Sequence, residues 1–454
     1  MRSVRHLVAG LAAGLLAACG GGPPDNVPDG PFAGRDVVVV VVDTLRADHL
    51  SFGGYPKETA PFLARLAAEG AVFPESFSGS SWTAPATASL FTSLHPDHHG
   101  VTTGLHLYER HADEDGDGLR LNRIPSSLQT LPELMRAAGY RTFCAADNPN
   151  INAEMGFARG FDHFSGGLYR GAAAVNADVL GWREALAADD RPAFLYLHYM
   201  DPHRPYHQRS PYYGLEGTVA AMEVHRANAA AYDSEIGYLD AHLAELFAEL
   251  GLDRGALVIL TADHGEEFGD HGSSDHGVTV HEELLRVPFV FGGWDAAGQP
   301  HFAPGERAGG VSTLDLLPTL RELIGLEAMQ VEEGLSLATR LLEPELGPPE
   351  QPRTLFAHRR YKTPGDHREL YAVIEGNWRL QVDVVGMGVK LFNLHKDPGS
   401  QVDVAGRNRV VTQRLLERLT EHRARARLHE LEFAPARRLG EEEAAGIGDL
   451  GYTD

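Results

Sequence analysis

The chain has 454 residues, of which 43% are hydrophobic and 23% charged, so it is long enough for a large buried core and has an ordinary globular composition. Its formal net charge of −23 argues against nucleic acid or another polyanion as a partner. The two cysteines are too few for a disulfide framework.

The N-terminus resembles a bacterial lipoprotein signal. Two arginines precede an apolar run at residues 7–18, which is too short to span a membrane, and the box "LAAC" ends at Cys19. We predict a signal peptide at residues 1–18, cleavage before Cys19 and a lipid on its thiol; a plain signal peptide or a short buried helix is the alternative. Residues 19–34 are rich in glycine and proline and read as a flexible tether. This pattern predicts an extracytoplasmic, membrane-anchored protein, on the periplasmic face or the cell surface.

Short apolar runs alternate with helical patterns along residues 35–344. Strands are expected at residues 36–43, 140–146, 192–200, 256–263 and 286–293. Helices are expected at residues 59–69, 85–94, 128–138, about 220–250 and 314–324. Strands that alternate with helices predict a wound α/β sheet in this domain.

A second unit follows a proline-rich break at residues 344–352. Residues 369–398 alternate apolar and polar side chains between glycine-containing turns, which is typical of an antiparallel meander, and a helix is expected at about 408–429. We therefore predict a C-terminal subdomain at residues 353–430. The acidic, small-residue-rich segment 431–454 is expected to be a loosely packed tail.

Polar residues come directly after several of the predicted strands. Asp43 follows the first strand, Asp201 and His203 follow the third, and Asp263 and His264 follow the fourth. Ligands of open α/β sheets bind at the carboxyl ends of strands, so these residues predict a site. A carboxylate after six valines must be solvated, paired or bound to metal. Adjacent Asp263 and His264 suit a divalent metal, although a turn rich in Asp and Gly is the alternative.

The stretch "SSWTAPATASLFTS", residues 80–93, allows two interpretations of Thr83. In the simpler one, Thr83 is the N-cap of a helix with Pro85 in its first turn, followed by a core-facing run to Leu94. In the other, an anionic ester binds at the helix N-terminus, where free N–H groups and the positive end of the dipole gather, and Thr83 attacks it. This stretch alone leaves both interpretations open.

Eight segments appear in an order and at separations that match a known family. They are "VVDTLRADHLSFGGY", "TAPFLARLAAEGAVF", "SWTAPATASLFTSLHPDHHGV", "LPELMRAAGYRT", "MDPHRPY", "YDSEIGYLDAHL", "TADHGEEFGDHG" and "HEELLRVPFV". Together they resemble the sulfatase-like branch of the alkaline phosphatase superfamily over roughly residues 35–425. The resemblance implies a large mixed, mostly parallel sheet sandwiched by helices, with a small C-terminal antiparallel sheet and helix. It also implies a metal-dependent hydrolase whose substrate is an anionic sulfate or phosphate ester.

The family's site residues can be carried over position by position. Asp43, Asp263 and His264 match metal ligands, and Thr83 matches the nucleophile, whose oxygen also faces the metal. The resemblance therefore implies one divalent metal ion, and it leaves Ca, Mn, Mg and Zn open.

Two histidines match the family's catalytic positions. His203 matches a histidine beside the scissile group that can protonate the leaving oxygen, although a loop histidine bonded to backbone is the alternative. His276 occupies a position where relatives have a histidine or lysine that touches the anion.

Three positions depart from the sulfatase pattern. The motif C/S-x-P-x-R, whose first residue is oxidised to formylglycine, reads Thr83-Ala84-Pro85-Ala86-Thr87 here. Threonine is not a known substrate for that oxidation, so we expect no formylglycine, and Thr87 replaces the arginine. Thr44 stands where many sulfatases have a second aspartate. These changes favour phosphoester hydrolysis or transfer through a metal-activated threonine hydroxyl. A genuine sulfatase without formylglycine, or a degenerate domain that binds an anionic glycan or lipid head group, is the alternative.

The segment "DEDGDG", from Asp113 to Gly118, has the spacing of a calcium loop. Its twelfth position is Ile124, so the bidentate acid of such loops is absent. The sequence therefore favours a solvated acidic loop, with a calcium loop as the alternative.

Overall fold

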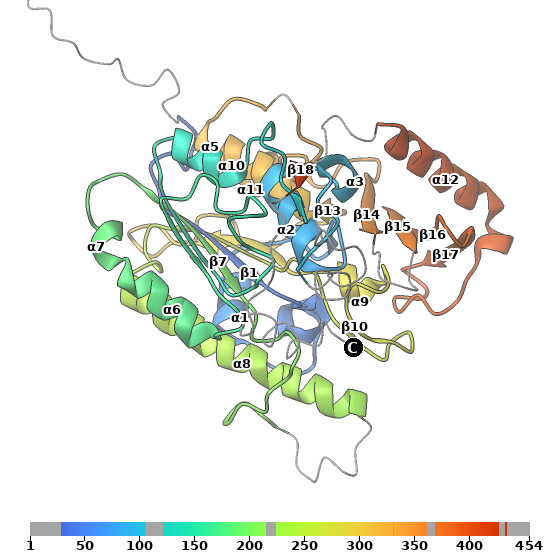
Figure 1. Ribbon diagram of the computed structural model, residues 1–454, viewed down its shortest axis with the longest axis horizontal. Helices are drawn as coiled ribbons and strands as arrows, with labels where there is room; N and C mark the ends of the chain where they lie inside the picture. Colours follow the sequence, from blue (N-terminus) through green and yellow to red (C-terminus); the bar gives the residue numbers. More distant parts are fainter. Residues whose placement is uncertain are drawn as a thin grey trace, which may run out of the picture.

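The computed structural model describes residues 29–105, 121–214, 224–329, 331–360, 368–425 and 432–433. Figure 1 shows a large central sheet with helices on both faces and a smaller C-terminal sheet beside it, covered by one long helix. The expected fold class is confirmed. Cys19 and the segment from Asp113 to Gly118 lie outside the described residues, as does most of the expected tail.

Eight strands form the central sheet, in the order β12-β2-β11-β8-β1-β7-β5-β6. They are β1 (Val37–Val42), β2 (Ala71–Val72), β5 (Arg141–Ala146), β6 (His163–Gly166), β7 (Ala193–Tyr199), β8 (Leu257–Thr261), β11 (Phe289–Gly293) and β12 (Gly305–Glu306). β1 lies between β7 and β8 and runs parallel to both. β11 is antiparallel to β8, so the sheet is mixed but mostly parallel.

The valine run of β1 explains why this strand is central. Val37, Val39 and Val41 face one hydrophobic core, and the alternate valines Val38, Val40 and Val42 face the other. All six are buried, which is the pattern of a strand covered on both faces. The continuous apolar run therefore brings the following residue, Asp43, to the middle of the sheet edge.

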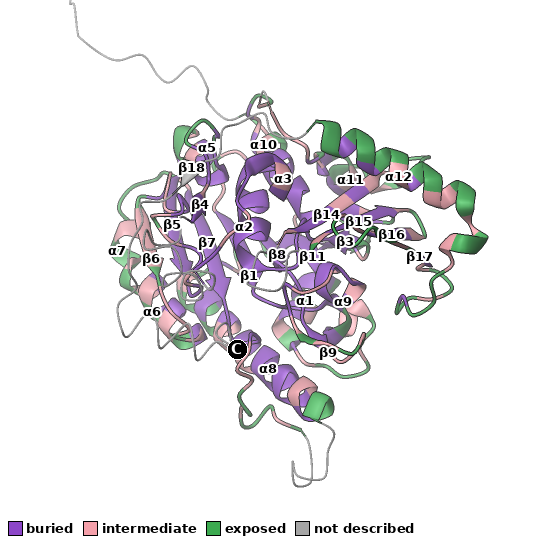
Figure 2. Cartoon of the chain, turned by 45° about the vertical axis from the view of Figure 1, so that its right-hand side comes forward, coloured by how far each residue is buried: buried purple, intermediate pink, exposed green. Residues whose placement is uncertain are grey.

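Two sets of helices cover the faces of the sheet (Figures 1 and 2). One core includes side chains of α2 (Thr83–Thr92), α5 (Leu131–Ala137), α10 (Leu316–Ile324) and α11 (Ala338–Leu342). The other includes side chains of α1 (Pro61–Ala68), α6 (Ala172–Gly181) and α8 (Val224–Leu250). The Asp240 carboxylate of α8 accepts the backbone N–H groups of Phe62 and Leu63, both at 2.9 Å. These two donors have no partner within α1, so the contact fixes the start of that helix.

The C-terminal subdomain is an antiparallel meander with a helix on one face. Its elements are β14 (Thr354–Arg360), β15 (Glu369–Glu375), β16 (Trp378–Asp383), β17 (Gly388–Asn393) and α12 (Arg409–Ala424). Leu415 and Leu419 of α12 pack on this sheet in a small core of their own. The meander predicted from residue 369 onward is confirmed, and β14 adds one strand before it.

The remaining α-helices and strands of the described residues are short. They are β3 (Ser76–Phe77), α3 (Pro96–His99), β4 (Asn122–Arg123), α7 (Arg183–Leu186), β9 (Glu267–Phe268), β10 (Ser274–Asp275), α9 (Glu282–Leu285), β13 (Val311–Ser312) and β18 (Glu432–Phe433). β18 lies in the segment predicted as a loose tail, yet its backbone pairs with β4. Among the described residues, no helix combines the length and the apolar character that crossing a membrane requires.

Candidate active site

The residues predicted to bind metal gather at the carboxyl ends of neighbouring parallel strands. Asp43 directly follows β1, and Asp263 and His264 follow the adjacent strand β8. Thr83, the first residue of α2, reaches the same place from one face of the sheet. All four side chains are buried, so their polar atoms depend on one another or on a ligand for partners.

The Thr83 hydroxyl faces the strand ends and not its own helix. Its Oγ1 donates to Asp43 Oδ2 at 3.3 Å and lies 3.4 Å from His264 Nε2. The N-cap of α2 is Trp82, and no side chain caps the helix. The interpretation of Thr83 as an N-cap is therefore wrong, because the extended backbone ends one residue earlier and leaves Thr83 as the first helical residue.

Asn148 is a site residue that the sequence analysis missed. Its Nδ2 donates to Asp43 Oδ2 at 2.7 Å and to Thr83 Oγ1 at 3.2 Å. The Thr83 hydroxyl thus accepts one hydrogen bond while it donates another, which fixes its orientation. Asn148 follows β5 by two residues. Because ligands of open α/β sheets bind at the carboxyl ends of strands, its position could have been recognised in the same way as that of Asp43.

His198 is a second site residue that the sequence analysis missed. Together with Asp43, Asp263 and His264, it surrounds the place where a cation would bind. Asp263 Oδ2 lies 3.6 Å from both His198 Nε2 and His264 Nε2, and Asp43 Oδ1 lies 3.4 Å from His264 Nε2. Among the described residues, neither Asp43 Oδ1 nor Asp263 Oδ2 has a hydrogen-bond donor. Two buried carboxylate oxygens without donors, next to imidazole nitrogens, fit a divalent cation. His198 was missed because it lies inside the apolar run of β7.

The electrostatics of this cluster favour the ionised form of Asp263. Burial opposes ionisation, but the neighbouring His264 and His198 outweigh it and lower the pKa of Asp263 to about 2. The pKa of His198 is raised, because Asp263 outweighs the cost of burying the imidazolium. The pair therefore presents a carboxylate, which is the form that binds a metal.

The ring of His276 lies next to the rings of both His264 and His203. The ring of His276 is centred 4.6 Å from the ring of His264 and 4.8 Å from that of His203. His203 Nδ1 donates to the Arg204 carbonyl oxygen at 2.5 Å, which orients its ring. Burial lowers the pKa of His203, with Asp43 opposing. The His203 imidazole is therefore harder to protonate than a free histidine.

Two carboxylates hold His276. Its Nδ1 lies 2.9 Å from Asp275 Oδ1 and 3.2 Å from Glu266 Oε1. Burial opposes protonation, but Glu266 and Asp275 raise the pKa of His276 well above its ordinary value. His276 is therefore a buried cation beside the cluster, which suits contact with an anion. Glu266 and Asp275 were missed because their segment reads as an Asp- and Gly-rich turn.

The remaining candidates lie close to the cluster without joining it. Thr87, at the position of the family's arginine, is buried within α2. Thr44 follows Asp43 with a backbone φ of 61°, a left-handed conformation that is unusual for a β-branched residue and ends the strand abruptly. Asp201 accepts the backbone N–H of Ala172 at 3.1 Å and so supports the start of α6.

Comparison with known proteins settles the family. The model of the Sulfatase family matches residues 35–326, well over half of the chain. The chain belongs to the sulfatase family. It is an ester hydrolase of the alkaline phosphatase superfamily, and members of this family bind a divalent metal.

Three known proteins illustrate the relationship. Human arylsulfatase A is 26% identical over an alignment 504 residues long, which covers 93% of this chain and 90% of the relative. The phosphonate monoester hydrolase of Agrobacterium radiobacter has the same fold, with a TM-score of 0.66 at 19% identity, over 90% of this chain and 99% of that one. A protein solved with its substrate D-glucosamine-2-N,6-O-disulfate has a TM-score of 0.68 at 16% identity, over 86% of this chain and 97% of that one.

Proposed function

We propose that this sulfatase-family hydrolase cleaves or transfers a phosphate ester, with the Thr83 hydroxyl as nucleophile. One divalent metal ion would be held by Asp43, Thr83, Asp263 and His264. The observation that carries the proposal is the direction of the Thr83 hydroxyl, which has Asp43 and His264 within 3.4 Å and makes no helix cap.

The residues around Thr83 supply the parts of an in-line displacement. A divalent metal, when bound, supplies positive charge that lowers the pKa of a hydroxyl and offsets the charge of a phosphoryl group. Thr83 Oγ1 forms the new bond to phosphorus, and its proton leaves toward Asp43 Oδ2, the acceptor of its hydrogen bond. Asn148 holds the hydroxyl in place by donating to the same oxygen.

Two histidines complete the reaction. We propose that His203 takes up a proton from solvent when the anionic ester binds; the bond from phosphorus to the ester oxygen then breaks, and His203 gives that oxygen this proton. The cationic ring of His276 attracts the phosphoryl oxygens. Water, or an acceptor alcohol in a transfer reaction, then attacks phosphorus and gives its proton to His203. The bond to Thr83 breaks, and Oγ1 takes back the proton that Asp43 accepted.

Two features of α2 support phosphate over sulfate as the transferred group. A threonine at position 83 is not the residue that becomes formylglycine, so we propose that Thr83 acts unmodified. Thr87 stands at the position where the sulfatase motif has an arginine. The fold likeness to a phosphonate monoester hydrolase is compatible with this choice, whereas the relationship to arylsulfatase A keeps sulfate-ester hydrolysis as the second candidate.

A substrate panel tests the proposal. The purified protein is stripped of metal and assayed with Mg²⁺, Mn²⁺, Ca²⁺ or Zn²⁺ on 4-nitrophenyl sulfate, 4-nitrophenyl phosphate, bis-4-nitrophenyl phosphate and a phenyl phosphonate ester. We expect kcat/KM to be highest on a phosphorus ester and the peptide containing Thr83 to have its unmodified mass. A preference for the sulfate ester would identify a sulfatase, and binding without turnover on every substrate would identify a degenerate domain.

A further inference from the structure

A second group of possible metal ligands lies where the C-terminal subdomain meets the large domain. Asp97 and His98 belong to α3, and His422 belongs to α12. One possible ligand atom from each of these three residues lies within 4.8 Å of the others. Asp97 Oδ1 is 3.4 Å from His422 Nε2 and 3.9 Å from His98 Nε2. These residues take no part in the reaction proposed above.

The three ligand atoms are buried and lack hydrogen-bond partners among the described residues. The side chains of His98 and His422 are each 5% exposed, and that of Asp97 is 11% exposed. The contacts of 3.4 and 3.9 Å with Asp97 are long for hydrogen bonds, so these buried polar atoms are poorly compensated for the water that they lose. A cation at their centre would satisfy all three.

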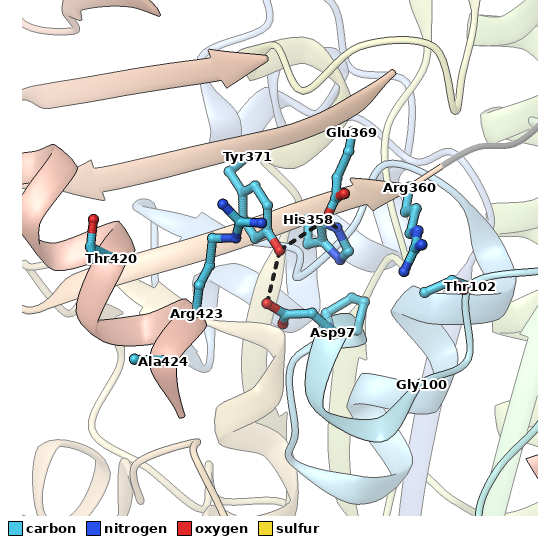
Figure 3. Close-up of a pocket in the computed structure, with 11 residues that line it drawn as sticks. Asp97, Gly100, Thr102, His358, Arg360, Glu369, Tyr371, Thr420, Arg423 and Ala424 are labelled. Carbon is cyan, nitrogen blue, oxygen red and sulfur yellow. Dashed lines mark hydrogen bonds and ion pairs between the residues drawn. The ribbon is translucent and has the colours of Figure 1, made fainter. Parts of the chain in front are cut away.

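Neighbouring side chains orient two of the three ligands. His98 Nδ1 lies 2.5 Å from Glu333 Oε1, so a proton on Nδ1 leaves a lone pair on Nε2, which is 3.9 Å from Asp97 Oδ1. The Tyr371 hydroxyl donates to Asp97 Oδ2 at 3.0 Å, which leaves Oδ1 for the cluster (Figure 3). A histidine whose second nitrogen is held by a carboxylate is the usual arrangement around protein-bound zinc.

We propose that Asp97, His98 and His422 bind a structural zinc ion that joins α12 to the large domain. Two imidazoles and one carboxylate are ligands that zinc prefers. Ligand atoms about 2.0–2.1 Å from zinc are about 3.3 Å apart in a tetrahedron, so small side-chain rotations are enough for the three atoms to share an ion. Asp97 also lines a cavity of about 360 Å³, from which water can supply the fourth ligand (Figure 3).

Metal stoichiometry tests the site with the full-length protein. Zinc binding is measured by equilibrium dialysis and elemental analysis for the wild type, His422→Phe, Asp97→Asn and the control His395→Phe. His422→Phe removes the ligand nitrogen but keeps a ring on Phe356, whose ring lies 4.2 Å from that of His422. His395 is exposed and lies outside the cluster. We expect each cluster variant to bind one zinc fewer than the wild type and the control to bind the same number.

A separate variant distinguishes this site from the active site. Asp263→Asn weakens metal binding beside Thr83, so any zinc bound there should be lost while the zinc held by Asp97, His98 and His422 stays. At a free zinc concentration of about 100 times its Kd, a bound ion raises the ratio of folded to unfolded protein about 100-fold. Zinc should therefore raise the melting temperature of Asp263→Asn, and this rise should disappear when His422→Phe is added.

Two outcomes would overturn the proposal. Equal zinc stoichiometry in the wild type, His422→Phe and Asp97→Asn would mean that no zinc binds at these residues. His98 would then only form an ion pair with Glu333. If the variants fail to fold, crystals of the wild type grown with zinc decide the question by anomalous scattering. A peak between Asp97, His98 and His422 is the expected result, and its absence at full occupancy of the other site would contradict the inference.

Discussion

Thr83 and Thr92 belong to the same helix, but their hydroxyls have different partners. Thr92 Oγ1 donates to the Ala88 carbonyl oxygen at 2.7 Å within α2, whereas Thr83 Oγ1 contacts Asp43, His264 and Asn148 from other elements. Both are buried. The pair therefore offers a matched comparison of a hydroxyl that supports a helix with one that faces the proposed reaction.

We expect Thr83→Val to lower kcat at least about a thousandfold, because the variant keeps the shape of the side chain and removes the nucleophile. The free energy of unfolding should change by only about 1 kcal/mol, since no helix cap is lost. Thr83→Ser should keep partial activity, and Thr92→Val should keep the wild-type kcat. Steady-state kinetics and melting temperature are measured side by side. Near wild-type turnover of Thr83→Val would rule out Thr83 as the nucleophile.

His203 should matter most for esters with poor leaving groups. A 4-nitrophenolate leaves readily without a proton, whereas an alkoxide needs one, so His203→Gln should slow alkyl esters by about 10²–10⁴-fold and aryl esters less. His207→Gln is the control, because this exposed histidine lies in the same loop. The measurement is kcat/KM across a series of leaving-group pKa values. Equal losses on every ester would show that His203 does not act as the general acid.

At the scale of elements, Glu235 joins α8 to the loop that contains His203. Its carboxylate accepts the His207 backbone N–H at 2.7 Å and Arg209 Nε at 2.7 Å. Burial raises the pKa of Glu235 from 4.5 to about 7, although Arg209 opposes the shift. The folded protein therefore holds this proton more tightly than the unfolded chain.

The sign of the resulting pH dependence follows from that difference. The contribution of Glu235 protonation to the free energy of unfolding is complete below about pH 4.5. It declines as pH rises and is lost above about pH 7. Glu235→Gln should make this decline shallower, and a residual slope should come from Asp201 and Asp240, whose pKa values burial raises to about 6. Urea unfolding across this pH range measures the slopes. The exposed Glu245→Gln should behave as wild type, and identical slopes for all three proteins would contradict the assignment.

At the scale of the whole molecule, we propose that the mature protein begins at a lipidated Cys19 and is held at a membrane outside the cytoplasm. Cys19→Ala should release the protein into the soluble extracytoplasmic fraction with unchanged activity on small esters. Cys144→Ala is the matched control, because Cys144 is buried in β5 and should not affect membrane attachment. Cell fractionation with mass spectrometry of the N-terminus measures both. Wild-type protein found wholly in the cytoplasm would overturn the proposal.

Local patterns in the sequence determined the α/β architecture and the edge of the sheet where the site lies. The valine run of β1 has side chains on both faces of the strand, and only a strand with helices on both sides buries such a pattern. The positions of Asp43 and of Asp263 with His264, directly after such runs, then follow from the parallel direction of β1 and β8. These features depend on neighbours in the chain, so the sequence was enough to predict them.

Only the tertiary structure decided which atoms meet. Thr83 finds its partners 40 and 181 residues away, and Asn148 reaches Asp43 across 105 residues. The direction of the Thr83 hydroxyl depends on where extended backbone ends before α2, a difference of one residue that the local sequence leaves open. His98 and His422 meet because the C-terminal subdomain brings α12 against α3. Such contacts depend on the packing of distant elements, which no local pattern encodes.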